Sequence, residues 1–392
     1  MTLPRGIFAG IESPVVQGGA RMIQIKLNFK SKAGVKAWLA AAFLVSFSGQ
    51  GQVVRADLGS ESTLPKSYLS ESDYVQRAAE NLRIQNHRAS ASIPAPLRPV
   101  TDFDNFKYLL MSGDFSFDSQ EMKRILVQNL PPRMKVVLLV YPGEQDRVRQ
   151  VFAKWISDPS RLILVAHSTA RSGFWARDAF PFPVHLDPSL TLGLVASKYD
   201  RPFEAHESIA SGVGGARNLT KYSHTFVGGN LLADESGRCF VVESRRLFGL
   251  RDGTLKQSYG CKEVYRLKHL SGIGDVDEVI KLLPRQRALT NRNEYVPLLK
   301  SLGYQVLALP GLSGFRTYAN SVIIDDIVFL PQYNRPEDHV AAEVYKTAGY
   351  RVIFVPSEVL ASEGKGSVHC ATMTYPAIKE EVLLRMLNLE RL

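Results

Sequence analysis

A histidine–cysteine pair near the end of the chain is the first place where this sequence could do chemistry. The stretch GKGSVHCATMTYP (364–376) sets His369 and Cys370 behind two glycines. Glycine lets a backbone approach a ligand closely, and a cysteine there can act as a nucleophile if its pKa is lowered. A buried structural thiol at the end of a strand is the alternative.

The cysteine count bears on that choice. The chain has three cysteines, Cys239, Cys261 and Cys370. A disulfide between the first two would leave Cys370 as the odd thiol, and the sequence leaves that pairing open.

Polar residues also stand in two earlier segments where strands meet loops. In GFWARDAFPF (173–182), Asp178 follows Trp175 and Arg177. A buried aspartate needs a cationic or hydrogen-bonding partner, so this is either a binding carboxylate or a structural Arg–Asp pair. In HTFVGGNLLADESG (224–237), Gly229 and Asn230 form either a tight bulge or part of a site.

Two later segments complete the set. In SGIGDVDEVIKLLP (271–284), Asp275 and Asp277 share one face if the stretch is an extended strand. Two carboxylates on one face can hold a planar cation bidentately, bind a metal, or simply face solvent. FRTYANSVII (315–324) places Asn320 just ahead of a strand.

Short apolar runs alternate with amphipathic stretches from residue 101 onward, which indicates an α/β fold. Strands are expected at 106–113, 135–142, 161–167, 191–197, 239–244, 263–267, 304–310, 321–325, 327–333 and 350–356. Helices are expected at 120–130, 146–156, 293–303 and 336–349. Strand–helix–strand units return every 60–70 residues or so, which hints at a repeated module. We expect one domain over 101–392 and an irregular lead-in over 57–100.

The N-terminus has the pattern of a secretory signal peptide. Lysines 26, 30, 32 and 36 precede the apolar run AWLAAAFLVSF (37–47), and Val54 and Ala56 stand at −3 and −1 of a cleavage site. Met22 is a possible start, and a buried N-terminal helix is the alternative. Residues 1–56 carry seven Lys/Arg and one Glu, so without them the net charge falls from +10 to +4. We therefore expect a secreted or periplasmic protein that binds no nucleic acid.

The order of WxRD, GGN, GxVDE, YxNS and GxxHCxT resembles the guanidino-group-modifying enzymes. The resemblance runs from about residue 105 to the C-terminus and is closest to bacterial-type peptidylarginine deiminases, with agmatine deiminases next. It implies the pentein fold, a five-bladed α/β propeller. It also implies hydrolysis of a guanidinium to a ureido group and ammonia through a covalent thiouronium intermediate, without metal or cofactor.

The resemblance also implies roles for individual residues. Cys370 becomes the nucleophile, and Asp178 and Asp277 hold the guanidinium nitrogens. Asn320 borders the site, and Gly229 and Asn230 line its centre. Trp175, Arg177 and His369 are further expected substrate contacts.

One position departs from the family pattern. Where these families have a histidine that gives a proton to departing ammonia, this chain has Asp275. Asp275 could do this work with a raised pKa, another histidine could reach the site, or the pocket could bind guanidinium without turnover. The candidate histidines are His185, His224, His269 and His369, the last of which strand alternation would point away from Cys370.

The substrate stays open between peptidyl-arginine, free arginine and agmatine, the precursor in putrescine biosynthesis. Export favours arginine in a peptide or protein. Arg171, Arg177 and Arg201 are candidates for recognising a substrate carboxylate, although each also suits a surface or structural role.

Overall fold

The computed structural model describes residues 65–66, 69–87, 95–141, 143–166, 173–198 and 219–392, with the backbone alone for 219–223. It also gives the backbone of two short paired strands, β1 (Val16–Gln17) and β2 (Ala20–Arg21). The chain divides into a unit of residues 1–58 and a unit of residues 59–392. The expected signal peptide and cleavage point therefore lie outside the described side chains.

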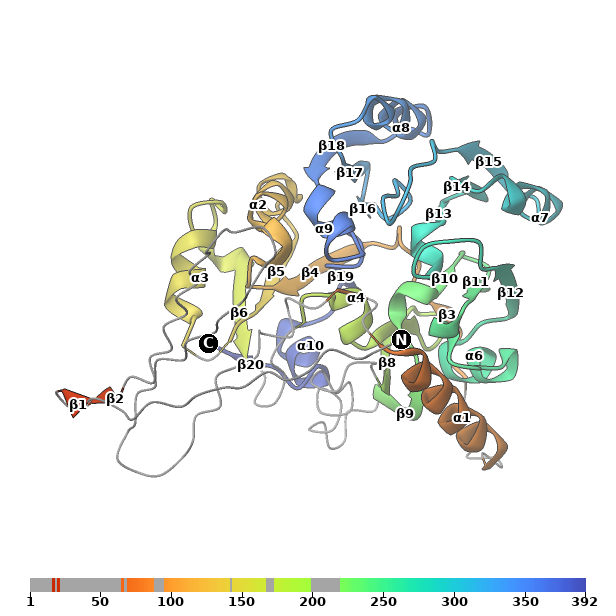
Figure 1. Ribbon diagram of the computed structural model, residues 1–392, viewed down its shortest axis with the longest axis horizontal. Coiled ribbons are helices and arrows are strands. Elements are labelled where there is room, and N and C mark those ends of the chain that lie inside the picture. The colour runs from red at the N-terminus through yellow and green to blue at the C-terminus, as the bar shows by residue number, and fades with distance from the viewer. Residues whose placement is uncertain are drawn as a thin grey trace, which may run out of the picture. The chain divides into compact units, whose positions relative to one another are not determined.

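The described part of the second unit contains five β-sheets, with helices between their strands (Figure 1). The first joins both ends of this unit in the order β19 (Met373–Pro376), β4 (Phe106–Ser112), β5 (Lys135–Leu139), β6 (Leu162–Ala166) and β20 (Glu390–Arg391). The second contains β3 (Arg98–Pro99), β7 (Phe182–His185), β8 (Leu192–Lys198) and β9 (Leu219–Thr225). The other three sheets have three strands each. The third contains β10 (Leu232–Ala233), β11 (Arg238–Glu243) and β12 (Glu263–Lys268). The fourth contains β13 (Ile280–Leu283), β14 (Arg287–Thr290) and β15 (Gln305–Ala308), and the fifth contains β16 (Val322–Ile324), β17 (Ile327–Gln332) and β18 (Arg351–Pro356).

The five sheets share one pairing pattern. In each of them an antiparallel pair, such as β10–β11 or β16–β17, is followed by a parallel pair, such as β11–β12 or β17–β18. Parallel strands need a crossover connection, usually a helix. That connection is α2 (Gln120–Asn129), α6 (Asp252–Tyr259), α7 (Val296–Ser301) and α8 (Pro336–Thr347) in four of the sheets. A repeated module is therefore present, but it is a strand–strand–helix–strand unit. Its first strands begin at Phe182, Leu232, Ile280, Val322 and Met373, so the expected spacing of 60–70 residues was too long.

The remaining helices are α1 (Glu71–His87), α3 (Gln145–Phe152), α4 (Ala176–Ala179), α9 (Glu358–Ser362) and α10 (Glu380–Met386). Short 3-10 helices are η2 (Ser116–Asp118), η3 (Pro159–Arg161), η4 (Gly228–Asn230), η5 (Arg245–Leu247), η6 (Val276–Glu278) and η7 (Asn293–Tyr295). Among the described helices, none has both the length and the hydropathy that a membrane crossing requires.

Local sequence explains why these elements form. Strand β4 (FKYLLMS) contains the apolar run 108–111 and is buried along almost its whole length, as expected for a strand with neighbours on both edges. Helix α8 begins with Pro336 in its first turn, and the Asp338 carboxylate accepts the N–H of Arg335. Gly349, with φ +92°, follows its end.

Three local expectations differ from the structure. The lead-in is not irregular throughout, because residues 71–87 form α1, whose Tyr74 stacks on Phe248. Asp275 and Asp277 do not lie on a strand, since η6 occupies 276–278 and the strand begins at Ile280. His369 and Cys370 lie in a turn before β19, so strand alternation does not apply to them.

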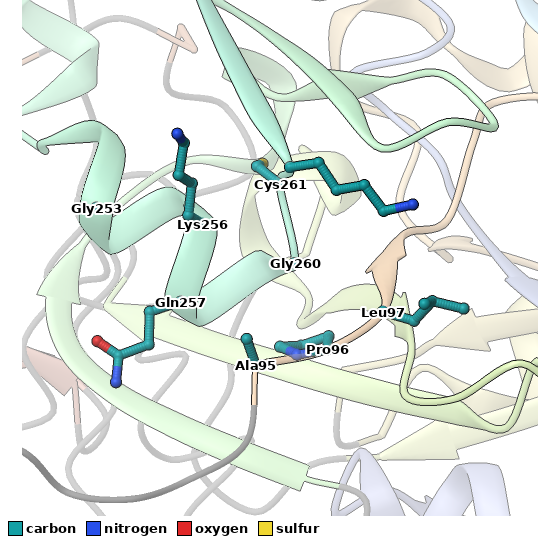
Figure 2. A pocket seen from close by; sticks show the side chains of 9 residues that line it. Ala95, Pro96, Leu97, Gly253, Lys256, Gln257, Gly260 and Cys261 are labelled. Atoms are coloured by element: carbon teal, nitrogen blue, oxygen red, sulfur yellow. The ribbon is translucent and has the colours of Figure 1, made fainter.

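The cysteine pairing that the sequence left open is present. Cys239 and Cys261 form a disulfide between β11 and the start of β12, and Cys370 is a buried free thiol. A surface hollow lies beside this disulfide, between α6 and the segment 95–97 (Figure 2). Its lining shares no residue with the candidate site described below.

Candidate active site

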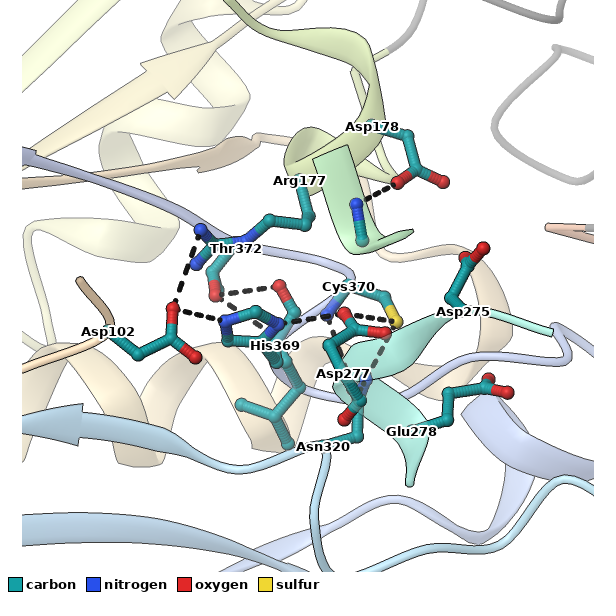
Figure 3. A network of polar contacts seen from close by, with 12 residues as sticks. Asp102, Arg177, Asp178, Asp275, Asp277, Glu278, Asn320, His369, Cys370 and Thr372 are labelled. Carbon is teal, nitrogen blue, oxygen red and sulfur yellow. Dashed lines mark hydrogen bonds and ion pairs between the residues drawn. The ribbon is translucent and has the colours of Figure 1, made fainter. Parts of the chain in front are cut away.

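Each of the five sheets supplies one segment to a common site, just ahead of its first antiparallel strand. Asp178 lies in α4 before β7, Gly229 in η4 before β10, and Asp277 in η6 before β13. Asn320 precedes β16, and Cys370 precedes β19. Figure 3 shows Asp178, Asp277, Asn320 and Cys370 together. Residues far apart in sequence thus meet because they occupy the same place in successive modules.

The Cys370 thiol is held by two of the expected partners. Asn320 Nδ2 lies 3.0 Å from Sγ, and Asn320 Oδ1 accepts the backbone N–H of Cys370. Sγ lies 3.6 Å from Asp277 Oδ2. Burial raises the pKa of the Cys370 thiol, as does the carboxylate of Asp277. The thiol is therefore neutral in this state and needs a change in its surroundings to become a thiolate.

A lysine from the lead-in enters the same space. Lys66 is fully buried, and its Nζ lies 3.0 Å from Cys370 Sγ, 2.8 Å from Asp275 Oδ2 and 3.6 Å from Asp178 Oδ2. Burial opposes protonation, but Asp178, Asp275 and Cys370 together raise the pKa of Lys66 well above its ordinary value. The site thus holds an ammonium ion between two carboxylates and the sulfur.

Arg246, from η5, ties the two carboxylates together. Its Nε donates to Asp275 Oδ1 and its Nη2 to Asp178 Oδ2, both at 2.8 Å, and its side chain is fully buried. Asp275 therefore has ion pairs on both oxygens, one with Arg246 and one with Lys66. Both oxygens of Asp275 are therefore engaged by charged side chains of the site.

His369 lies behind Asp277, on the side away from the thiol (Figure 3). Its Nδ1 is 2.8 Å from Asp277 Oδ2, and its Nε2 is 3.0 Å from Asp102 Oδ1. Burial and the nearby Arg177 lower the pKa of His369, while Asp102 opposes them. Burial alone would raise the pKa of Asp277, but Lys66 and His369 lower it to about 2. Asp277 is therefore ionised beside the thiol.

The other candidate histidines contact other groups. His185 bonds to Asp104, His224 to Tyr259, and His269 to the carbonyl of Gly272. Of the four candidates, His369 is the one that the structure joins to a carboxylate of the site.

Several expected substrate contacts have structural partners instead. The side-chain amide of Asn230 bonds through both its nitrogen and its oxygen to the backbone of Val242. Arg177 donates its backbone N–H to the carbonyl of Cys370, and its guanidinium lies 3.9 Å from Asp102. Arg171 and Arg201 lie outside the described residues.

The two glycines ahead of Cys370 make room for a ring. A Cβ on Gly366 would lie 2.5 Å from the Trp175 ring, and one on Gly364 would lie 2.9 Å from it. The glycines of this loop therefore make room for the Trp175 ring. The sequence had suggested instead that they let a ligand approach the backbone. Gly229 does face the site: its N–H donates to Asp178 Oδ1, and a Cβ there would lie 2.9 Å from Lys66 Nζ.

Glu278 is a further buried acid that the sequence analysis missed. Burial raises its pKa well above the ordinary value, and Asp275 and Asp277 add to that rise, against the opposing charge of Lys66. Its Oε1 is buried and has no hydrogen-bond partner among the described residues. Figure 3 draws Glu278 in the same cluster as Asp275 and Cys370. Burial and the two neighbouring acids therefore favour the protonated form of Glu278.

Comparisons with known proteins agree with the resemblance that the site motifs showed. A profile of the Porphyromonas-type peptidyl-arginine deiminase family matches residues 299–376, which include Asn320 and Cys370. This chain resembles the guanidino-group-modifying enzymes. Two solved members have a similar fold. The agmatine deiminase of Campylobacter jejuni is 19% identical, with a TM-score of 0.57 over 71% of this chain and 95% of its own. That of Enterococcus faecalis is 16% identical, with a TM-score of 0.58 over 73% and 98%.

At these identities the structural likeness concerns the fold, and a search of curated sequences finds no match to this chain. The architecture is a mixed α/β fold similar to that of these two agmatine deiminases. Measured against the sequence pattern of the guanidino-group-modifying enzymes, Asp275 takes the histidine position, and here it is bound to Lys66 and Arg246.

Proposed function

We propose that this protein hydrolyses the guanidinium group of peptidyl-arginine, giving citrulline and ammonia through a covalent intermediate on Cys370. One observation carries the proposal: a cationic nitrogen lies 3.0 Å from Cys370 Sγ and within 3.6 Å of both Asp178 and Asp275. A space that holds a cation between carboxylates and against a thiol suits a substrate that is itself a planar cation.

The proposed first step begins when the guanidinium replaces Lys66. The Cys370 sulfur attacks the guanidinium carbon, the C–N bond to one terminal nitrogen breaks, and that nitrogen leaves as ammonia with the proton that the thiol gives up. Asn320 and Asp277 position the sulfur. Fixed geometry of this kind supplies part of the rate by proximity.

We assign the proton transfers to Glu278. Ammonia needs a proton on departure, and the water that later attacks the thiouronium carbon must lose one. Glu278 is buried in the same cluster as Asp275 and Cys370 (Figure 3), and its raised pKa favours the protonated state that a general acid needs. Asp275, with ion pairs on both oxygens, instead holds Arg246 in place.

Two further features are part of the proposal. The shared pairing pattern of the five sheets, with one site segment ahead of each, supports their closure into the five-bladed pentein propeller. The Cys239–Cys261 disulfide supports export, because disulfides persist in oxidising compartments. The signal peptide predicted from residues 1–56 would provide that export.

A guanidinium-binding protein without turnover is the second candidate. It is favoured by the neutral thiol and by the histidine position being Asp275. Formation of the ureido product decides between the two. Peptides with internal and C-terminal arginine, free arginine and agmatine would be incubated with the parent, with Lys66→Ala and with Cys370→Ser. Citrulline from an arginine substrate, or N-carbamoylputrescine from agmatine, that requires Cys370 establishes the hydrolase, and the preferred substrate shows which compound is used. Binding without product in every chain would refute it.

A further inference from the structure

The main chain of Lys66, like its side chain, is bonded to residues of the site. The Lys66 N–H donates to the carbonyl of Gly364 at 2.7 Å, and its carbonyl accepts from Arg246 Nη1 at 3.2 Å. Both partners belong to the site: Gly364 precedes Cys370 in the same loop, and Arg246 bridges the two carboxylates. Lys66 is therefore bound through its backbone on both sides and through its ammonium in the centre.

The reach of this side chain matches the reach of arginine. Counting outward from Cα, lysine Nζ is the same atom number as the guanidinium carbon of arginine. An arginine bound as Lys66 is bound would put that carbon near the position of Nζ, about 3 Å from Cys370 Sγ, a distance suited to attack. Its terminal nitrogens would face Asp178 and Asp275, and Gly229, without a Cβ, leaves space beside them.

We propose that Lys66 is a self-bound substitute for the substrate, and that Gly364 and Arg246 form a site for the main chain of an arginine-containing peptide. This rests on the proposed function and adds to it a peptide-backbone subsite and an intramolecular competitor. Lysine has no guanidinium carbon, so it occupies the site without reacting. Agmatine keeps an amine in place of the backbone N–H but lacks the carbonyl that accepts from Arg246.

A tethered competitor has a high effective concentration, in the millimolar range for short flexible connections. A peptide substrate must displace it, so the parent is expected to be slow. Replacement of Lys66 should raise turnover of an internal-arginine peptide by about tenfold or more.

The first test measures access to Cys370 without relying on turnover. Iodoacetamide labelling of Cys370 would be followed by mass spectrometry in the parent, Lys66→Ala and Lys66→Met, with Lys346→Met on exposed α8 as the matched control. We expect faster labelling in the two Lys66 variants and an unchanged rate in the control. An acetyl-Gly-Arg-Gly-amide peptide should slow labelling of the Lys66 variants, and agmatine should do so less well. Protection by the peptide separates an opened site from an unfolded chain, because an unfolded chain has nothing to protect.

The second test uses Lys66→Arg, which keeps the charge. The Cys370 sulfur would attack the guanidinium carbon of the introduced arginine, ammonia would leave with a proton, and water would then replace sulfur, so that one nitrogen is exchanged for oxygen. Peptide mapping in heavy-oxygen water should find labelled citrulline at position 66. The same variant carrying Cys370→Ser should stay unconverted, as should the Lys346→Arg control at position 346.

The outcomes separate this inference from the proposed function. Faster labelling with peptide protection, but no citrulline in any chain, supports the occupied subsite and refutes the hydrolase. Equal labelling and equal turnover in the parent and the Lys66 variants supports the hydrolase and overturns the inference. Equal protection by agmatine and peptide would overturn the backbone subsite.

Discussion

Replacing Arg246 by methionine tests whether the buried charges of the site stabilise the fold as one network. The Arg246 side chain is fully buried and donates to Asp178 and Asp275 at 2.8 Å each. Methionine keeps much of the aliphatic volume and removes the charge, so both carboxylates would lose a buried cationic partner. Loss of one partner from a buried ion pair costs about 3–5 kcal/mol. We expect the free energy of unfolding to fall by about 4 kcal/mol and, in a unit of this length, Tm to fall by about 6 °C.

A double-mutant cycle measured by urea unfolding at neutral pH checks the reasoning. Arg246→Met and Asp275→Asn should each be destabilising, and the double variant should be less so than their sum by about 2 kcal/mol. The neighbouring Arg245→Met is the matched control, because that guanidinium is 50% exposed and pairs with the exposed Glu71. It should cost less than about 1 kcal/mol. Additive effects within about 0.5 kcal/mol, or an Arg246→Met cost as small as the control, would refute the network.

Three further changes have defined outcomes. Glu278→Gln should lower the rate of citrulline formation by about 100-fold or more while Cys370 labelling persists; unchanged turnover would remove Glu278 from the proton transfers. Gly366→Ala puts a Cβ 2.5 Å from the Trp175 ring, so a loss of about 1–3 kcal/mol in unfolding free energy is expected, and a neutral result would contradict it. The pKa of Asp104 is lowered from 3.8 to about 2 by hydrogen bonds that outweigh burial. Its contribution of about 2 kcal/mol is present above the unfolded pKa and lost as pH falls from about 4 to 2. The Asp104→Asn variant should be less stable by that amount at neutral pH, and its free energy of unfolding should change less between about pH 4 and pH 2. An unfolding free energy with the same pH dependence as the parent would contradict this role of Asp104.

Much of the architecture could be read from the sequence because apolar runs and helical periodicity are local signals. The ten expected strands appear as β4, β5, β6, β8, β11, β12, β15, β16, β17 and β18, and helix α8 lies where its pattern predicts. The strands β7, β9, β10, β13, β14, β19 and β20 were not expected; they are short or lack a long apolar run. Helix α1 was missed because its exposed face is charged and only a few residues, Tyr74 and Asn81 among them, are buried. Helix α1 is held by its contacts with η5 and β9. Such tertiary contacts cannot be predicted from a largely polar segment of sequence.

The site was partly visible for a similar reason. Cys370, Asp178 and Asn320 stand in short motifs, whereas Lys66 lies 304 positions before Cys370 in a segment with no motif. Arg246 likewise looks like any surface arginine in the stretch ESRRLFGL. A usable signal did exist for Lys281, a charged residue inside the apolar run VIKLL. It is fully buried and pairs with Asp102, which in turn holds His369.

The first sheet makes completion of the site a late step of synthesis. Strand β19 (Met373–Pro376) pairs with β4 (Phe106–Ser112), and the turn ahead of β19 carries Cys370. Until synthesis has reached β19, the edge of β4 that pairs with it is open and the thiol is absent from the cluster around Asp277 and Asn320. The cluster can therefore assemble only after β4 has waited for a strand that is distant from it in sequence.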